Sequence, residues 1–336
     1  MRFNNRRVAG LVVLIFFVGS SVQSSDNQTL VYKKKYIMGT VFEIAAYGKS
    51  SERVSAAVDE AFREIVRIDD LISNYKPESA LSALNRSAHF HTERVPSELY
   101  HLVEQALMFS KLSEGKFDIT VAPLVDLWKA ALAGDAIPSP AQRLQAQACV
   151  GYEKIELTPP DQVMFRSSCL HVDLGAIGKG YAVDRAAEIL HALQIQDAII
   201  NAGGSTILAI GSPPGQMAWP VHLRDPSHTF DPYVILKDGS VSTSEQTAPS
   251  LLGRDSPGHI IDSTTGTPLQ TQFAVSVIAP SGTMSDGLST TLLLLGPGAG
   301  QVLVNHTPAV SAIWISPRAQ IKIATNGPQI RFNGKL

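Results

Sequence analysis

A glycine-rich segment at residues 173–184, DLGAIGKGYAVD, constrains the local fold more than any other part of this chain. Gly175, Gly178 and Gly180 surround Lys179 where a helix is predicted to begin. A helix N-terminus presents free backbone N–H groups and a positive dipole potential, which favour an anion. A lysine in the first turn opposes that dipole, and a bound phosphate would explain it. The alternative is a glycine-rich turn with a solvated lysine, since the spacing matches neither a P-loop nor a G-x-G-x-x-G fingerprint.

A second candidate site lies in the helix predicted over residues 283–295. Asp286 and Thr290 are four residues apart and therefore share one face of that helix. A carboxylate and a hydroxyl could together ligate Mg²⁺, which prefers oxygen ligands and retains phosphate partners. Residues 292–295 are all leucine, so the helix should be buried, where an unpartnered carboxylate is costly. A simple hydrogen bond on a helix surface is the alternative.

The segment GHIID at residues 258–262 contains a candidate catalytic base. His259 could accept or relay a proton near a reacting phosphate. The alternative is a histidine that caps the end of a strand. The residues alone do not decide between these two roles.

The pattern of strands and helices predicts an α+β fold, because mixed elements follow one another without a regular βαβ rhythm. Paired strands are expected over residues 32–47, followed by an amphipathic helix over 51–73. A second helix is expected over 97–113 with Ser97 as its N-cap. A hairpin over 152–165 should lead to a strand that ends near Asp173.

The N-terminus resembles a secretory signal peptide. Three arginines precede the apolar run at residues 8–18, and small residues follow as far as residue 24. Eleven apolar residues cannot span a bilayer as a helix, so we expect export to the periplasm and a folded domain over residues 30–336. An uncleaved N-terminus could instead tether the protein to the inner membrane. Cleavage would leave 25 basic and 30 acidic residues without a basic stripe, which argues against a nucleic-acid partner.

The chain has two cysteines, Cys149 and Cys169, on either side of the predicted hairpin. An oxidising compartment permits a disulfide between them. The sequence does not establish that their Cα atoms lie close enough, so the pairing stays open. The absence of a C-x-x-C motif gives no support to redox or zinc chemistry.

Several further motifs, taken with the glycine-rich segment, resemble the FAD:protein FMN transferase (ApbE) family over roughly residues 31–330. The early M-G-T motif is similar to residues 38–40. The S-x-Y and L-x-x-L-N motifs resemble residues 73–75 and 81–85, and G-x-F-D-x-T-V resembles residues 115–121. Asn201 to Gly204 and residues 285–291, SDGLSTT, complete the resemblance, which implies an ApbE-like two-lobed flavin-transferase fold.

The resemblance implies a reaction and a set of site residues. The enzyme would transfer FMN from FAD to a Thr or Ser hydroxyl of a partner flavoprotein, in the periplasm or at the membrane, releasing AMP. Mg²⁺ and the Lys179 charge would neutralise the phosphoryl oxygens. The implied FAD contacts are Met38, Tyr75, Lys116, Phe117, Asp118, Asp173, Lys179 and the backbone of Ile260. The implied metal ligands are the carbonyl of Ala176, the Asp286 carboxylate and the Ser289/Thr290 end of the motif.

Three positions depart from the family pattern. Ser205 replaces an aspartate, Ser263 replaces a proline, and Glu245 replaces a glycine in the segment TSEQT. A carboxylate near a phosphate would repel it, so Ser205 and Glu245 put the transfer step in question, and two alternatives stay open. The protein could be an FAD pyrophosphatase that yields FMN and AMP, or an FAD-binding protein without catalysis.

Overall fold

The computed structural model describes residues 28–133, 137–246 and 260–333. The predicted signal peptide and His259 lie outside these residues. The domain boundary predicted at residue 30 stays a prediction.

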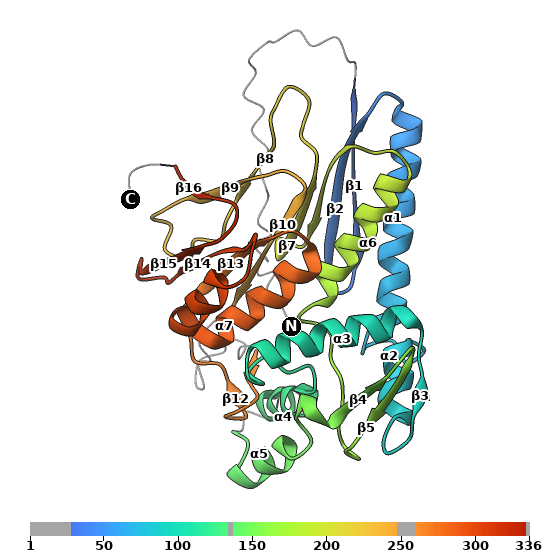
Figure 1. Ribbon diagram of the computed structural model, residues 1–336, viewed down its shortest axis with the longest axis vertical. Helices are drawn as coiled ribbons and strands as arrows, with labels where there is room; N and C mark the ends of the chain where they lie inside the picture. Colours follow the sequence, from blue (N-terminus) through green and yellow to red (C-terminus); the bar gives the residue numbers. More distant parts are fainter. Residues whose placement is uncertain (1–27, 134–136, 247–259, 334–336) are drawn as a thin grey trace, which may run out of the picture.

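An eight-stranded sheet forms the centre of the larger lobe (Figure 1), and all its neighbouring strands pair antiparallel. In spatial order the strands are β1 (Thr29–Ile37), β2 (Thr40–Gly48), β6 (Asp197–Ala202), β7 (Thr206–Ile210), β10 (Gly239–Glu245), β13 (Ala274–Ala279), β14 (Ser311–Ile315) and β15 (Ile321–Thr325). The tight turn at residues 38–39 joins the first two strands and, as shown below, reaches the candidate site.

Three long helices cover one face of this sheet (Figure 1): α1 (Ser51–Ile72), α6 (Gly178–Ala192) and α7 (Gly282–Asn305). Ser50 caps α1, since its side chain accepts a hydrogen bond from the Arg53 N–H. The apolar residues of α1 recur every three or four positions and are buried in the main core. On the opposite face, a second core lies under a three-stranded sheet of β8 (Trp219–His222), β9 (Pro232–Leu236) and β16 (Ile330–Phe332).

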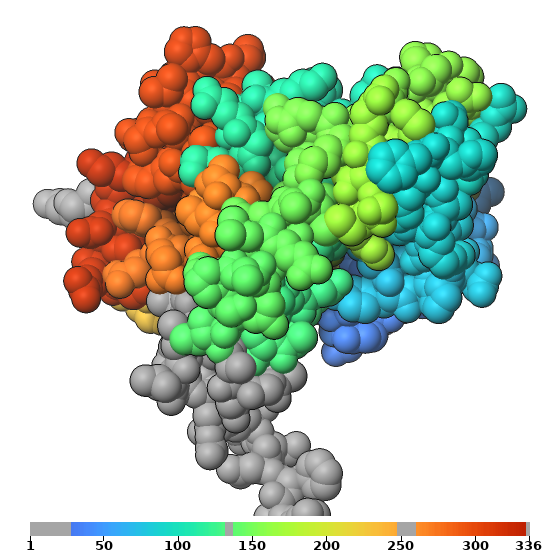
Figure 2. All heavy atoms as spheres, turned by 90° about the horizontal axis from the view of Figure 1, so that it is seen from below, coloured from blue at the N-terminus to red at the C-terminus, as the bar shows by residue number. Residues whose placement is uncertain are grey.

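A smaller lobe continues from the lower end of these helices (Figure 1). Its elements are α2 (Ala80–Ser87), β3 (Glu93–Arg94), α3 (Ser97–Leu112), α4 (Ala122–Ala133), α5 (Pro140–Gln147), a 3₁₀ turn (Tyr152–Lys154), β4 (Ile155–Thr158) and β5 (Gln162–Phe165). The short hairpin of β11 (Ile261–Asp262) and β12 (Thr267–Pro268) packs against it. Figure 2 shows this orange segment beside the green α4–α5 region, where the Trp128 indole N–H donates to the Gly266 carbonyl at 2.8 Å.

The structure confirms the α+β fold and corrects two local predictions. Ser97 is the first residue of α3 rather than its cap, because Pro96 holds the N-cap position without a side-chain hydrogen bond. No strand leads into Asp173: residues 166–174 are not paired with a neighbouring strand. Instead, the Val172 backbone binds the Asn85 side chain and the Asp173 N–H donates to the Ile119 carbonyl.

The helix α7 is longer than predicted and is kinked at Gly296, which has φ of 72° and precedes Pro297. Among the described helices it is the one whose length and apolar composition would also suit a membrane span. Half of that apolar window is buried within the protein, where α7 packs against α6, β10 and β13. This burial explains the run of four leucines.

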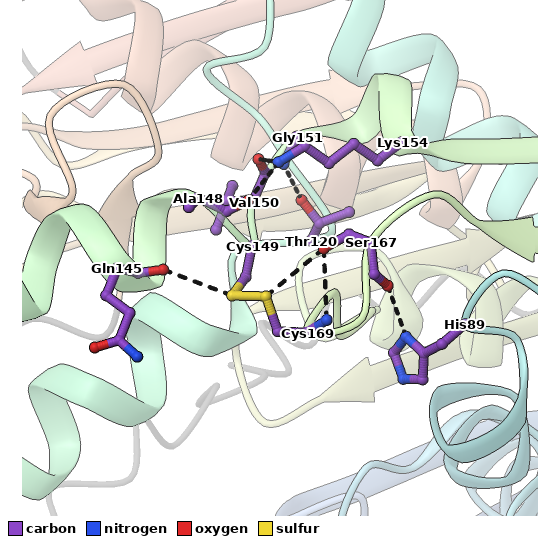
Figure 3. The surroundings of a disulfide bond; sticks show 10 residues. All are labelled: His89, Thr120, Gln145, Ala148, Cys149, Val150, Gly151, Lys154, Ser167 and Cys169. Carbon is purple, nitrogen blue, oxygen red and sulfur yellow. Dashed lines mark hydrogen bonds between the residues drawn. A yellow bond between two sulfur atoms is a disulfide. The ribbon is translucent and has the colours of Figure 1, made fainter.

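The two cysteines form a disulfide, with their Cα atoms 5.1 Å apart (Figure 3). The bond joins the residues after α5 to the segment that leads to Asp173. Hydrogen bonds brace both sides: Gly151 N–H donates to Thr120 Oγ1 at 2.7 Å, and His89 Nδ1 lies 2.8 Å from the Ser167 carbonyl oxygen. The bond therefore closes a 20-residue separation within the smaller lobe.

Replacing both cysteines with serine should lower the free energy of unfolding by roughly 3 kcal/mol, because the unfolded chain would lose a loop constraint of this length. Denaturant unfolding of the oxidised wild type and the double variant measures the difference. A reductant should destabilise the wild type alone. Two titratable thiols in the unfolded, unreduced wild type would contradict the bond.

Candidate active site

A cleft of about 600 Å³ lies where three segments distant in sequence converge. One wall comes from the β1–β2 turn, another from the end of α1 and residues 73–76, and the third from residues 173–179. Four of the predicted FAD contacts line it: Met38, Tyr75, Asp173 and Lys179. The volume falls within the range of ligand and cofactor pockets.

Glycine makes the meeting of these walls sterically feasible. A Cβ on Gly178 would lie 2.9 Å from the Ile72 Cδ1 atom and 3.6 Å from the Met38 Cε atom. Met38 itself occupies the left-handed region with φ of 52°, and Gly39 follows with φ of 74°. The first turn of α6 can therefore lie directly against the hairpin turn that carries Met38.

Tyr75 stands at the mouth of the cleft with 85% of its surface exposed. The Lys129 ammonium lies 5.8 Å from the centre of its ring and 3.5 Å from its hydroxyl. An exposed aromatic ring at a pocket mouth offers a face on which a planar ligand can stack. The position of Tyr75 therefore suits the flavin contact that the sequence predicted.

The N-terminus of α6 opens toward the cleft beside Lys179. The residue at its N-cap, Ile177, provides no side-chain cap. Asp173 organises the preceding turn, since its carboxylate accepts the Gly175 N–H at 2.7 Å. The Lys179 ammonium donates to the Gly175 carbonyl at 3.4 Å. The charge of the lysine and the helix dipole thus act on the same side of the cleft, as an anion site requires.

The helices α6 and α7 cap each other. Asp286 of α7 accepts the Gly180 N–H of α6 at 2.8 Å. In return, Asp184 of α6 accepts the backbone N–H groups of Gly282 and Thr283 at 2.6 and 2.8 Å, and the Thr283 hydroxyl at 2.6 Å. Each carboxylate satisfies donors that have no partner within their own helix.

This exchange depends on two glycines. A Cβ on Gly180 would lie 2.1 Å from the Gly282 carbonyl oxygen and 2.7 Å from the Asp286 Cβ atom. A Cβ on Gly282 would lie 2.5 Å from the Gly180 carbonyl oxygen. Only glycine at both positions lets the helices approach closely enough for the two caps to form.

Burial raises the pKa of Asp286, while the positive charge of Lys179 and the hydrogen bond from Gly180 lower it. Burial likewise raises the pKa of Asp184, against the hydrogen bonds from Thr283 and Gly282. Asp286 is only 4% exposed. Since a desolvated carboxylate gains most from an added positive charge, this site favours a cation.

One turn along α7 from Asp286, hydroxyl groups of this helix meet a hydroxyl group of the facing strand β10. The Ser244 Oγ lies 2.8 Å from the Ser289 Oγ and 3.1 Å from the Thr290 Oγ1. The Ser289 hydroxyl also donates to the Asp286 carbonyl at 2.9 Å. Three of the predicted metal ligands, Asp286, Ser289 and Thr290, are thus brought together.

The donor set suits Mg²⁺ better than a transition metal. Within the described residues, no three His, Cys, Asp or Glu side chains gather as a metal site. One buried carboxylate with hydroxyl and carbonyl oxygens is the kind of partial set that Mg²⁺ accepts, because it keeps waters and substrate phosphates as further ligands. The fourth predicted ligand, Ala176, lies in the turn just before α6.

Four predicted FAD contacts do not line the cleft. The Phe117 ring is 2% exposed and packs in the core against Phe109, so it offers no exposed face to the cleft, and its contact with a flavin stays a prediction. Lys116 lies 3.8 Å from the Asp262 carboxylate. The Asp118 carboxylate accepts three hydrogen bonds, from the Thr120 N–H and hydroxyl and from the Tyr152 N–H. These residues shape the loop between α3 and α4.

Ile260 also differs from expectation. Its backbone N–H donates to the Gln246 Oε1 at 2.6 Å. Its carbonyl accepts from the Gln246 side-chain amide at 2.8 Å and from the Leu269 N–H at 2.9 Å. The backbone groups predicted to reach FAD are therefore already satisfied, because Gln246 fastens this segment to the end of β10.

The substitution at Glu245 does not place a charge at the candidate metal site. Successive side chains of a strand point to opposite faces, and Ser244 faces α7. Glu245 instead binds Arg224 through both carboxylate oxygens, each 2.9 Å from a guanidinium nitrogen. The Glu245 carboxylate points away from α7 and is neutralised by Arg224, so it should not repel a phosphate bound at the site.

The other two departures are accommodated locally. The Ser205 hydroxyl donates to the Ala202 carbonyl at 3.1 Å and closes the turn between β6 and β7. The Ser263 hydroxyl donates to the Gly115 carbonyl at 2.7 Å, which ties the β11–β12 hairpin to the smaller lobe.

Sequence reasoning missed Asp184 and several residues of the cleft, among them Tyr36, Asp69 and Asn74. Asp184 ends the glycine-rich motif and lies on the second turn of α6, whose burial became known only from the structure, and a carboxylate there needs a partner. Tyr36 and Asp69 carried no sequence signal. Their roles depend on which segments meet in space.

Comparison with known proteins decides the family. The model of the ApbE family matches residues 38–314, which include both helix caps and all the residues lining the cleft except Tyr36 and Ile37. The chain belongs to the ApbE family. It is 30% identical to an FAD:protein FMN transferase of Treponema pallidum, covering 94% of this chain and 92% of that protein. A relative of the same name from Haemophilus influenzae is 28% identical, with 86% and 87% covered.

Solved structures agree with this membership. A mutant of the flavin transferase ApbE from Vibrio cholerae superimposes with a TM-score of 0.76 at 25% identity, covering 89% of this chain and 98% of that one. The apo flavinyl transferase ApbE of Pseudomonas stutzeri gives a TM-score of 0.75 at 25% identity, with 89% and 96% covered. The family, the fold and the transferase class predicted from the sequence are thereby confirmed.

Replacing Gly180 with alanine should destabilise the protein by about 1–3 kcal/mol or more, because the new methyl group would force the two capped helices apart. Gly298 provides the matched control, because a Cβ added there would meet no neighbouring group within 4 Å. Its alanine variant should be neutral or slightly stabilising. Denaturant unfolding of both variants measures this contrast, and equal stabilities would contradict the close contact.

Proposed function

We propose that this protein is a Mg²⁺-dependent enzyme that transfers FMN from FAD to a Thr or Ser hydroxyl of an acceptor flavoprotein. The supporting observation is the interlocked pair of helix N-termini, which sets Lys179 at the cleft and Asp286 beside the hydroxyl cluster. The names of its relatives specify FAD as donor and a protein as acceptor. The acceptor hydroxyl and the metal are our inference.

In the proposed reaction the acceptor oxygen attacks the phosphorus of the FMN half of FAD. The bond from that phosphorus to the oxygen of the AMP half breaks, and AMP leaves with the electron pair. The acceptor proton goes to a base, for which His259 remains our candidate although it lies outside the described residues. The products are an FMN phosphoester on the acceptor and AMP.

The residues of this chain have separate tasks. Met38 and Tyr75 contact the flavin, while Asp173 fixes the turn before α6. Lys179 and the α6 N-terminus stabilise charge on the pyrophosphate oxygens. Asp286, Ser289, Thr290 and the Ala176 carbonyl would hold Mg²⁺, which when bound withdraws charge from the phosphoryl oxygens and favours departure of AMP.

We also propose that the protein is exported and works in the periplasm. The apolar segment at residues 8–18 and the disulfide between Cys149 and Cys169 support this location. The N-terminus, if uncleaved, would tether the enzyme to the inner membrane. N-terminal sequencing of protein from the periplasmic fraction would distinguish a cleaved from a tethered form.

The function is tested by following AMP release from FAD and Mg²⁺, with and without a threonine-bearing acceptor flavoprotein. A transferase gives acceptor-dependent AMP and a covalently fluorescent acceptor. AMP without labelling indicates FAD hydrolysis to FMN and AMP. Bound FAD without AMP indicates a non-catalytic FAD-binding protein, and either result would contradict the transfer.

Asp286→Asn should lower the rate of AMP release at saturating Mg²⁺ by about 100-fold or more, since it removes the charge expected to hold the metal. An asparagine oxygen can still accept the Gly180 N–H, so the variant should remain folded. Asp286→Ala removes the cap as well and should lose more stability. Wild-type activity of Asp286→Asn in the presence of a chelator would refute the assignment.

The stabilisation by Mg²⁺ should depend on pH through Asp286. Burial raises the pKa of this carboxyl in the folded state, so without metal its ionisation destabilises the fold as pH rises through that raised pKa. Binding Mg²⁺ requires the ionised form. The increase in melting temperature caused by Mg²⁺ should therefore grow with pH across that range in the wild type. In Asp286→Asn, the increase in melting temperature caused by Mg²⁺ should not change with pH. If the wild type and Asp286→Asn showed the same pH dependence, Asp286 would be excluded as a ligand.

A further inference from the structure

Asn85 of α2 binds the backbone of Val172 on both sides. Its Oδ1 accepts the Val172 N–H at 2.8 Å, and its Nδ2 donates to the Val172 carbonyl at 2.9 Å. The same Nδ2 donates to the Asn74 Oδ1 at 3.1 Å. Asn74 in turn donates to the Val172 carbonyl at 3.1 Å. Asn85 is only 5% exposed, and a buried amide with this many partners is held in one orientation.

These contacts supply the backbone hydrogen bonds that Val172 would otherwise make to a neighbouring strand. Residues 166–174 have no strand neighbour, so the polar backbone of Val172 needs another partner. The side chain of Asn85 supplies a donor and an acceptor, as an adjacent strand would. Asn85 is thus the partner of the Val172 N–H, and it shares the Val172 carbonyl with Asn74.

The two segments that Asn85 joins form two separate walls of the cleft. Asn74 is followed by Tyr75 on one wall, and Val172 is followed by Asp173 on the other. Asn85 itself does not line the cleft. It binds both segments from behind and fixes the spacing between the walls.

We propose that Asn85 is a positioning residue for the FAD site, which sets the separation of Tyr75 from Asp173 without touching the ligand. The inference rests on the proposed use of this cleft for FAD. Loss of the amide would leave the Val172 N–H without its partner, remove one of the two donors to the Val172 carbonyl and let the walls separate. FAD affinity should fall, whereas the groups around Asp286, which Asn85 does not contact, should keep their arrangement.

The test compares Asn85→Ala with Val234→Ala in the full-length oxidised protein. Val234 is fully buried in the second core, on the other face of the sheet, and serves as a control for lost stability alone. FAD binding is titrated without metal, and AMP release is measured as kcat and KM. For Asn85→Ala we expect a rise in Kd and KM of about tenfold or more, with kcat at saturating FAD within about threefold of wild type. Val234→Ala should leave both the Kd for FAD and the KM unchanged.

Asn85→Asp provides a second readout that a structural role alone would not move. An ionised carboxylate can accept the Val172 N–H but repels the Val172 carbonyl, whereas the protonated acid can donate to that carbonyl. FAD affinity of this variant, relative to wild type at each pH, should improve as pH falls. This measurement also decides the matter if Asn85→Ala fails to fold.

The outcomes separate this inference from the proposed function. If the wild type does not bind FAD, the proposed function fails and this inference fails with it. If the wild type binds FAD and Asn85→Ala binds equally well, only the positioning role is refuted. An equal loss of affinity in Val234→Ala, or a pH-independent defect in Asn85→Asp, would likewise refute it.

Discussion

The close contact between Gly180 and Gly282 is the constraint on which the candidate site depends. It brings the first turns of α6 and α7 together, so that Asp286 caps one helix and Asp184 caps the other. Each helix then presents one charged residue of the site, Lys179 or Asp286, at a fixed place. A buried carboxylate would ordinarily destabilise the fold. Here each is stabilised by backbone N–H groups that would otherwise lack partners, so the capping that joins the helices also prepares the site.

The cleft shows how irregular segments are held in place without sheet hydrogen bonding. Residues 166–174 carry Asp173 into the site, yet their backbone is held by the Asn85 side chain, the Ile119 carbonyl and, further back, the disulfide at Cys169. These contacts position the loop without a neighbouring strand. The position of the loop depends on these few groups of the smaller lobe, so the smaller lobe contributes to the shape of the site.

The departures from the family pattern show that a substitution must be judged by its direction as well as its chemistry. Glu245 would repel a phosphate if its carboxylate faced α7. Strand alternation directs it to the other face, where Arg224 neutralises it. The neighbouring serine, Ser244, meets the hydroxyls of Ser289 and Thr290. Because strand β10 was not predicted from the sequence, this distinction could not be made before the fold was known.

Elements with local signals could be predicted from the amino-acid sequence alone. Apolar periodicity predicted α1, and the glycine-rich motif predicted the start of α6. The carboxylate of Asp286 and the hydroxyl of Thr290, four residues apart, predicted the polar end of α7. The grouping of Lys179 with Asp286 followed from the family motifs. The three-dimensional arrangement was needed to show that Phe117 lies in the core and that Gln246 binds Ile260. It also revealed the contacts of Asp184 and Asn85 around the site. The contacts of Asp184 and Asn85 join residues up to 99 positions apart, and no local pattern of polarity or volume encodes which distant backbone group a side chain will meet.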